Sequence, residues 1–148
     1  MKVQQATLKD LEELNELFDG YRVFYEKKSN KKASNAFLKA RIQNNESVIF
    51  IARDSAGIAT GFTQLYPLFS STRMKRVWLL NDLFITPKYR GQGYSKALIE
   101  VAKELCRKTD AAGMTLETAK DNYVGNRLYP ATGWTLDEEH NFYYWEPK

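Results

Sequence analysis

The sequence predicts an α/β (α+β) fold, in which a mixed, mostly antiparallel central sheet of six to seven strands is flanked by about four helices. Two observations support this prediction. Strand-like apolar stretches follow one another in the first half of the chain, with turn residues between them. A long amphipathic helix then separates the strand-like stretches 76–86 and 114–119, which implies a crossover and therefore one parallel pair of strands.

The first elements are a short strand at 3–6 and a helix that Thr7 caps, with Asp10 three residues further on. This helix continues through 21–26 or breaks near Gly20. A loop at 27–32 and a helix capped by Ser34 or Asn35 are expected next, followed by strands at 46–54, 59–69 and 76–86, with Pro67 at an edge or end. The second half is expected to contain a helix from Gly93 to about Lys108, a strand at 114–119, a helix at 122–133 and a hairpin at 134–147.

Length and composition suggest one domain over residues 1–148, with enough chain to bury a core. The formal net charge of +4 suits a small anionic ligand and is too diffuse to indicate nucleic acid. With a single cysteine and a single histidine, no disulfide and no metal site are expected. The first residues lack the apolar core of a signal peptide, and no apolar run is long enough to span a bilayer, so a cytoplasmic protein without a membrane partner is expected.

Two closely spaced glycines, Gly91 and Gly93, stand directly before the long helix. A helix N-terminus presents unpaired N–H groups and a partial positive charge, and a bare backbone lets a pyrophosphate approach these donors. Arg90 adds a cation and Ser95 a small hydroxyl side chain. The stretch therefore predicts a phosphate-binding turn.

Two phosphate-binding motifs fit this turn less well. A Walker loop would end in Gly-Lys-Ser or Gly-Lys-Thr, which is absent. A dinucleotide fingerprint would need a third glycine where Lys96 stands, although Glu117 could hold a ribose hydroxyl. That alternative is weakened rather than excluded.

Two stretches together resemble the GCN5-related N-acetyltransferases. Residues 90–95 are similar to the family's motif Gln/Arg-x-x-Gly-x-Gly/Ala, with Ser95 at the last position. Residues 121–134 are similar to its pattern Asn-x-x-Ala-x-x-Leu-Tyr-x-x-x-Gly-Phe, with Gly125 for Ala and Trp134 for Phe. Within the family, the chain most resembles the diamine acetyltransferases and the yeast histone and polyamine acetyltransferase group.

The resemblance implies acetyl-CoA as co-substrate. The pantetheine arm would run along the strand before the turn and contact Asn122, and a backbone N–H around Leu83 or Phe84 would stabilise the oxyanion. The residues expected to bind acetyl-CoA are Leu83, Phe84, Ile85, Arg90, Gly91, Gln92, Gly93, Tyr94, Ser95, Lys96, Asn122, Gly125 and Asn126.

The resemblance also implies catalytic roles. Tyr129 stands where the family places its general acid, and a phenol is protonated at neutral pH. The diamine acetyltransferases place a glutamate base where this chain has Asn81. Asp82 follows, but strand alternation would point the two side chains to opposite faces. The base is therefore left open between Asp82, a water chain and another acid.

The acceptor is expected to be an amine, which Tyr21, Tyr25 and Glu26 would bind through cation–π and charge contacts, with Asn81 nearby. A polyamine-like or other small amine is the first expectation and the lysine side chain of a peptide the second. The aromatic residues 142–145 hint at a homodimer. Two other classes remain open: a non-catalytic CoA-binding module, and a nucleotide- or nucleic-acid-binding module, which would need a basic stripe.

Overall fold

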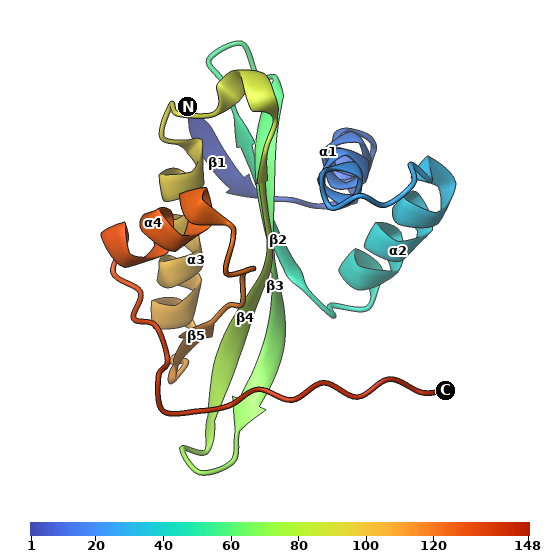
Figure 1. Ribbon diagram of the computed structural model, residues 1–148. Helices are drawn as coiled ribbons and strands as arrows, with labels where there is room; N and C mark the ends of the chain where they lie inside the picture. Colours follow the sequence, from blue (N-terminus) through green and yellow to red (C-terminus); the bar gives the residue numbers. More distant parts are fainter. The chain divides into compact units, whose positions relative to one another are not determined.

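A sheet of five strands forms the centre of residues 1–117 in the computed structural model, which describes all 148 residues. The strands lie in sequence order across the sheet (Figure 1). Strands β1 to β4 pair antiparallel and β5 pairs with β4 in parallel, so the mixed, mostly antiparallel sheet is confirmed. The strands are β1 (Lys2–Gln5), β2 (Val48–Arg53), β3 (Ala59–Ser70), β4 (Lys75–Ile85) and β5 (Gly113–Thr115).

Helices cover both faces of this sheet. Helices α1 (Leu11–Phe24) and α2 (Lys31–Gln43) lie on one face and α3 (Tyr94–Lys108) on the other (Figure 1). A second compact unit, residues 118–148, contains α4 (Tyr123–Ala131). None of these helices combines the length and the apolar character that crossing a membrane requires. One domain over residues 1–148 stays a prediction.

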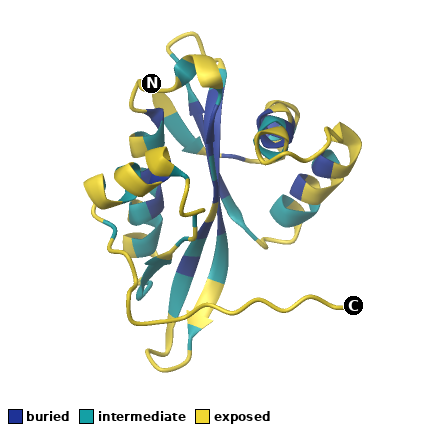
Figure 2. Cartoon of the chain, in the orientation of Figure 1, coloured by how far each residue is buried: buried dark blue, intermediate teal, exposed yellow.

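The core lies on both faces of the central strands, where Figure 2 shows most of the buried residues. On the α1 and α2 face, Leu14 and Leu38 pack with Ile51. On the α3 face, Leu98 packs with Ala52. Because side chains alternate along a strand, the neighbouring residues Ile51 and Ala52 serve the two faces. This two-sided burial explains the continuous apolar run of β2.

The first helical segment begins as the sequence indicates. Thr7 and Asp10 form a reciprocal capping box at a short 3-10 turn (Leu8–Asp10) that leads into α1. The helix continues through Gly20 to Phe24, so no break occurs at the glycine.

The cap of α2 was predicted at the wrong residue. Asn30 caps the helix, because its side-chain oxygen accepts a hydrogen bond from the Ala33 N–H. Ser34 is instead buried inside the helix and donates to Asn15 Oδ1 at 2.5 Å. Its hydroxyl therefore joins α2 to α1 rather than capping a helix.

Pro67 lies in a part of β3 that has a neighbour on one side only. The last pair between β2 and β3 joins Val48 and Leu65, whereas pairing with β4 continues to Ser70. The missing N–H of Pro67 therefore costs no hydrogen bond to β2, as its predicted edge position requires.

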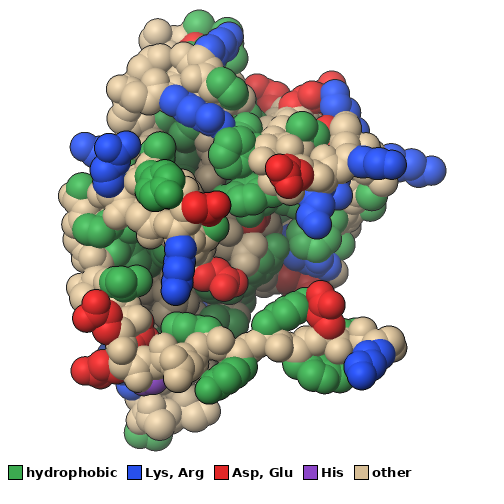
Figure 3. Space-filling model, in the orientation of Figure 1, with side chains coloured by type: hydrophobic (Ala, Val, Ile, Leu, Met, Phe, Trp, Pro, Cys, Tyr) green, Lys and Arg blue, Asp and Glu red, His purple; other side chains and the backbone are tan.

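The expectation of six to seven strands is wrong, because no hairpin forms at 134–147 and the sheet has five strands. The fifth strand, β5, is also shorter than expected, with three residues. Instead of the hairpin, Asp137 forms a local turn in which its carboxylate accepts the N–H groups of Glu139 and His140. The flanking residues do not pair. Four consecutive aromatic residues, 142–145, break strand alternation and stay exposed, and Figure 3 shows hydrophobic side chains along this C-terminal segment.

Arg53 links the end of β2 to the start of α1. Its guanidinium contacts Asp10 at 2.9 Å and Glu13 at 2.7 Å, and it also donates to the carbonyl of Gly57 at 3.1 Å. Only 15% of the Arg53 side chain and 10% of the Asp10 side chain is exposed. In contrast, the ion pair between Lys75 and Asp110 is largely exposed.

Arg53→Gln should lower the free energy of unfolding by about 2 kcal/mol, because it leaves the buried Asp10 carboxylate without its cation. Lys75→Gln is the matched control and should change the free energy of unfolding by less than about 0.5 kcal/mol. Urea denaturation of both variants measures the difference. Equal losses would mean that the Arg53 cluster adds no more than a surface pair.

Candidate functional site

The glycine turn before α3 has the backbone geometry of an anion-binding site. Gly91 and Gly93 adopt left-handed φ values of 74° and 87°, a region that favours glycine. A Cβ at Gly91 would meet no atom within 4 Å, and a Cβ at Gly93 only the end of the Met1 side chain at 4.0 Å. The space above the turn is therefore open to a ligand.

The first N–H groups of α3 face this open turn. No side chain caps the helix at Gly93, so the first N–H groups are available as donors. The side chain of Tyr94 is buried against Tyr89, and Gln92 donates to the Lys88 carbonyl at 3.0 Å. The turn thus offers chiefly backbone donors, and Ser95 and Lys96 complete it at the start of the helix.

The strand that leads into this turn has an open edge. Pairing between β4 and β5 ends at Leu79 and Thr115, although β4 continues to Ile85. On its other side β4 stays paired with β3 as far as Ile85. Residues 80–85, which include the predicted positions Leu83 and Phe84, therefore leave backbone groups of one edge unpaired. An extended ligand could pair with them as an additional strand.

Arg90 connects the turn with two other elements. Its Nε donates to the Ile85 carbonyl at 3.0 Å, at the end of β4. Its guanidinium lies 5.1 Å from the centre of the Phe24 ring and 5.8 Å from that of Phe84. The cation is thus held by aromatic faces of α1 and β4.

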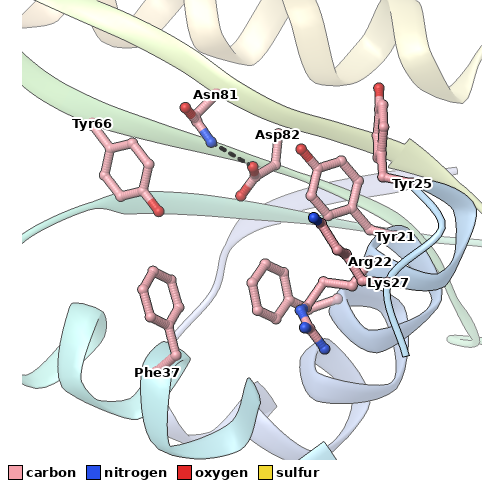
Figure 4. A pocket seen from close by; sticks show the side chains of 9 residues that line it. Tyr21, Arg22, Tyr25, Lys27, Phe37, Tyr66, Asn81 and Asp82 are labelled. Atoms are coloured by element: carbon pink, nitrogen blue, oxygen red, sulfur yellow. Dashed lines mark hydrogen bonds between the residues drawn. The ribbon is translucent and has the colours of Figure 1, made fainter. Parts of the chain in front are cut away.

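A pocket of about 330 Å³ lies between α1, α2 and the strands β3 and β4 (Figure 4). We call it the tyrosine pocket. Its walls are mostly aromatic, its floor carries a carboxylate and an amide, and two cationic side chains also line it. The lining residues are Phe18, Tyr21, Arg22, Tyr25, Lys27, Phe37, Tyr66, Asn81 and Asp82.

A β-bulge brings two consecutive polar residues into this pocket. Gln64 of β3 pairs with Asp82, and the next residue, Leu65, pairs with Leu80, so Asn81 has no partner in the ladder. Asn81 and Asp82 both line the pocket, and Asn81 Nδ2 donates to Asp82 Oδ1 at 2.7 Å. The expectation that they point to opposite faces is wrong, because the bulge interrupts strand alternation.

The Asp82 carboxylate is buried without a cationic partner. The residue is 2% exposed, and Gln64 Nε2 donates to its second oxygen at 2.5 Å. Ser47 donates to Gln64 Oε1 at 2.8 Å, which holds the amide with its NH₂ group toward Asp82. Burial raises the pKa of Asp82, and hydrogen bonds from Gln64, Asn81 and Tyr21 oppose this shift. A buried carboxyl group with a raised pKa, open to a pocket, is a candidate proton acceptor.

Two tyrosines share the environment of Asp82. Burial raises the pKa of Tyr66 to about 12, and the charge of Asp82 adds to this shift. The pKa of Tyr21 is also raised, first by burial and then by Asp82. Figure 4 shows the Tyr21 hydroxyl directed toward the carboxylate. Both phenols thus stay protonated and can donate hydrogen bonds at neutral pH.

The structure brings together four of the residues predicted around the acceptor, Tyr21, Tyr25, Asn81 and Asp82, but not Glu26. Glu26 is exposed just beyond α1, with a left-handed φ of 61°. Sequence reasoning missed several lining residues, because periodicity marks Phe18 and Phe37 only as helix core and cannot show that they border a cavity. The missed lining residues are Phe18, Arg22, Lys27, Phe37 and Tyr66.

The other predicted site residues lie in the second unit, at or on α4. Asn122 caps this helix, accepting from the Gly125 N–H at 3.1 Å and donating to Thr118 Oγ1 at 2.8 Å. A Cβ at position 125 would come within 2.7 Å of the Asn122 amide, so glycine leaves room for the cap. Asn126 donates to carbonyl groups of the preceding turn, and Tyr129 packs edge-on against Trp134.

Comparisons with known proteins agree with this geometry. The model of the acetyltransferase (GNAT) family matches residues 11–134. The protein named "Uncharacterized N-acetyltransferase YhfO" of Bacillus subtilis is 42% identical over 137 residues, which cover 93% of this chain and 91% of that protein. A "Probable acetyltransferase" of Haemophilus influenzae is 35% identical over 123 residues, covering 83% of this chain and 84% of that protein.

Solved structures show the same fold. The crystal structure of a probable acetyltransferase matches with a TM-score of 0.96 at 38% identity, covering 100% of this chain and 99% of that one. The aminoglycoside acetyltransferase AAC(6')-Iy, solved with a bisubstrate analogue of CoA, matches with a TM-score of 0.82 at 22% identity, covering 99% and 98%. The chain therefore belongs to the acetyltransferase (GNAT) family and is an N-acetyltransferase that uses acetyl-CoA.

Proposed function

We propose that this enzyme transfers the acetyl group of acetyl-CoA to a small primary amine that binds in the tyrosine pocket. The observation that carries this proposal is the Asp82 carboxylate, which is buried, has no cationic partner and borders an aromatic pocket. Aromatic faces attract an alkylammonium group, and a carboxylate beside them completes a site for such a cation. Asp82 would also take the proton that the amine must lose before it can attack.

The donor would be held by the turn and the open strand edge. Backbone N–H groups from Gly91 to Lys96 would bind the pyrophosphate of CoA, since the turn is open and the helix start is uncapped. The unpaired edge of β4 at Leu83, Phe84 and Ile85 would bind the pantetheine arm. A backbone N–H of Leu83 or Phe84 would stabilise the oxyanion. In the second unit, Asn122, Gly125 and Asn126 are proposed to help by shaping the start of α4.

The proposed transfer combines one bond formed and one bond broken with the proton transfers that they require. Asp82 accepts a proton from the ammonium group, the neutral nitrogen forms a bond to the acetyl carbon, and the C–S bond breaks. Tyr129 then donates its phenolic proton to the leaving thiolate, and the second proton of the nitrogen, which the amide product does not keep, restores the Tyr129 phenol. The products are the acetylated amine and CoA with a free thiol.

We propose a small amine as acceptor in preference to the lysine side chain of a protein, because the volume of the pocket fits a small molecule. Polyamine-like acceptors belong to this class. Homodimerisation and a cytoplasmic location are also proposed; the exposed aromatic residues Phe142 and Trp145 support a contact between subunits.

Thiol release from acetyl-CoA tests the proposal. The panel contains putrescine, spermidine, free lysine, an aminoglycoside and a lysine-rich peptide, and mass spectrometry identifies the acetylated product. Turnover of a small amine supports the proposed function. Turnover of the peptide alone would move the protein-lysine alternative to first place. Binding of acetyl-CoA without release for any acceptor would favour the non-catalytic CoA-binding alternative.

Gly93→Val should weaken acetyl-CoA binding by at least about 100-fold, because a branched side chain disfavours the left-handed φ and covers the helix N-terminus. Gly57→Val is the control, since Gly57 has a similar φ of 83°, and a Cβ there would also meet no atom within 4 Å. Both variants should lose similar stability, and only the first should lose affinity in a calorimetric titration. Unchanged affinity of Gly93→Val would contradict the proposed cradle.

Asp82→Asn should lower kcat/KM by about 100-fold or more, because the amide cannot accept the proton of the ammonium. In the wild type, kcat/KM should fall as the pH falls through the pKa of Asp82, which burial places above the usual range. Asp82→Asn should lose this acid limb, and because its NH₂ group faces the donors Gln64 and Asn81, activity is measured below the melting temperature of the variant. The same acid limb in the variant would assign the base to another group.

Tyr129→Phe should lower kcat by about 100-fold without weakening acetyl-CoA binding, because it removes only the proton of the general acid. Tyr123→Phe is the matched control on the same helix, where the Tyr123 side chain is exposed. Steady-state kinetics and a binding titration separate the two effects. An unchanged kcat for Tyr129→Phe would remove Tyr129 from the mechanism.

A further inference from the structure

The tyrosine pocket contains charges of both signs that are not paired with each other. Asp82 receives hydrogen bonds from the neutral side chains of Gln64 and Asn81 and has no salt bridge. Arg22 and Lys27 line the same pocket and form no salt bridge either. A ligand that fills the pocket would therefore meet an anionic floor and two cations.

Arg22 helps to lower the pKa of Asp19, the nearest acid of its own helix, but the two form no salt bridge. Asp19 lies one turn earlier, but Ser29 Oγ and the Asn30 N–H already donate to its carboxylate, at 2.6 and 2.8 Å. Arg22 Nη1 donates to the Lys28 carbonyl at 3.1 Å, which fixes the guanidinium near the end of α1. Arg22 thus hydrogen-bonds to a carbonyl group and keeps only a through-space attraction to Asp19.

A strained turn returns Lys27 to the pocket beside Arg22. The Lys27 N–H donates to the Arg22 carbonyl and the Glu26 N–H to the Val23 carbonyl, which is the Schellman pattern at the end of a helix. Glycine usually takes the left-handed position of this motif, but here Glu26 occupies it, with φ of 61°. The turn leaves the Glu26 side chain outside the pocket and Lys27 inside it.

We propose that the acceptor is an amine that also carries a carboxylate, such as an amino acid. Asp82 and the aromatic walls would bind its ammonium group, and Arg22 and Lys27 would bind its carboxylate. A diamine or polyamine would instead place a second positive charge beside these two cations. The inference rests on the proposed function and narrows its acceptor class.

Matched acceptors that differ by one carboxylate test the inference. L-Lysine is compared with cadaverine, L-ornithine with putrescine, and 4-aminobutyrate with butylamine, by thiol release from acetyl-CoA. The acceptor with the carboxylate should have a kcat/KM at least about tenfold higher in one or more pairs, as expected for hydrogen bonds between charged groups.

The double variant Arg22→Gln/Lys27→Gln should lose this preference, and each single variant should lose part of it. Lys39→Gln/Lys108→Gln is the control, because both lysines are exposed outside the pocket and the change in net charge is the same. The control should keep the wild-type preference.

The outcomes separate this inference from the proposed function. The inference is overturned if the wild type prefers the diamines, or if the double variant keeps the preference for acceptors with a carboxylate. Either result leaves the proposed function intact. If no amine releases thiol, titration calorimetry in the presence of CoA decides: lysine binding that exceeds cadaverine binding and is lost in the double variant supports the charge assignment without catalysis. Equal or absent binding of both overturns the inference as well.

Discussion

The β-bulge at Asn81 is the constraint on which the proposed acceptor site depends. Without the extra residue, strict alternation would send either Asn81 or Asp82 to the opposite face of the sheet. With it, one face of β4 presents an amide and a carboxylate side by side at the tyrosine pocket. The bulge lies within residues 80–85, where the edge that faces β5 is unpaired while pairing with β3 continues to Ile85.

Keeping an unpaired carboxylate inside the protein requires compensation, because burial disfavours the charged form. The chain uses neutral donors: Gln64, oriented by Ser47, and Asn81. A cation in their place would stabilise the carboxylate more strongly and make it a weaker base. Burial raises the pKa of Asp82, and the amides, whose hydrogen bonds oppose this shift, do so less than the full charge of a lysine or arginine would.

Local features of this fold could be predicted from sequence, and features set by distant pairing could not. The capping box at Thr7 and the glycine turn at 91–93 depend on neighbouring residues, and the structure forms both. The bulge depends on the register between β3 and β4, which periodicity within one strand does not reveal. The hairpin expected at 134–147 does not form, and the reason is again a missing long-range partner, since aromatic residues favour strands only where another part of the protein packs on them. The tyrosine pocket could not be predicted, because its lining residues come from four separate elements.

Arg90 has a thermodynamic consequence beyond its place in the glycine turn. Its guanidinium rests on Phe24 and Phe84, so the turn for the donor and the aromatic cluster near the acceptor share one side chain. Phe84 in turn lies 6.4 Å from the ring of Tyr21, a wall of the tyrosine pocket. A free energy of coupling between two ligands is reciprocal. Any factor by which the bound donor changes acceptor affinity through this contact is therefore the factor by which the bound acceptor changes donor affinity.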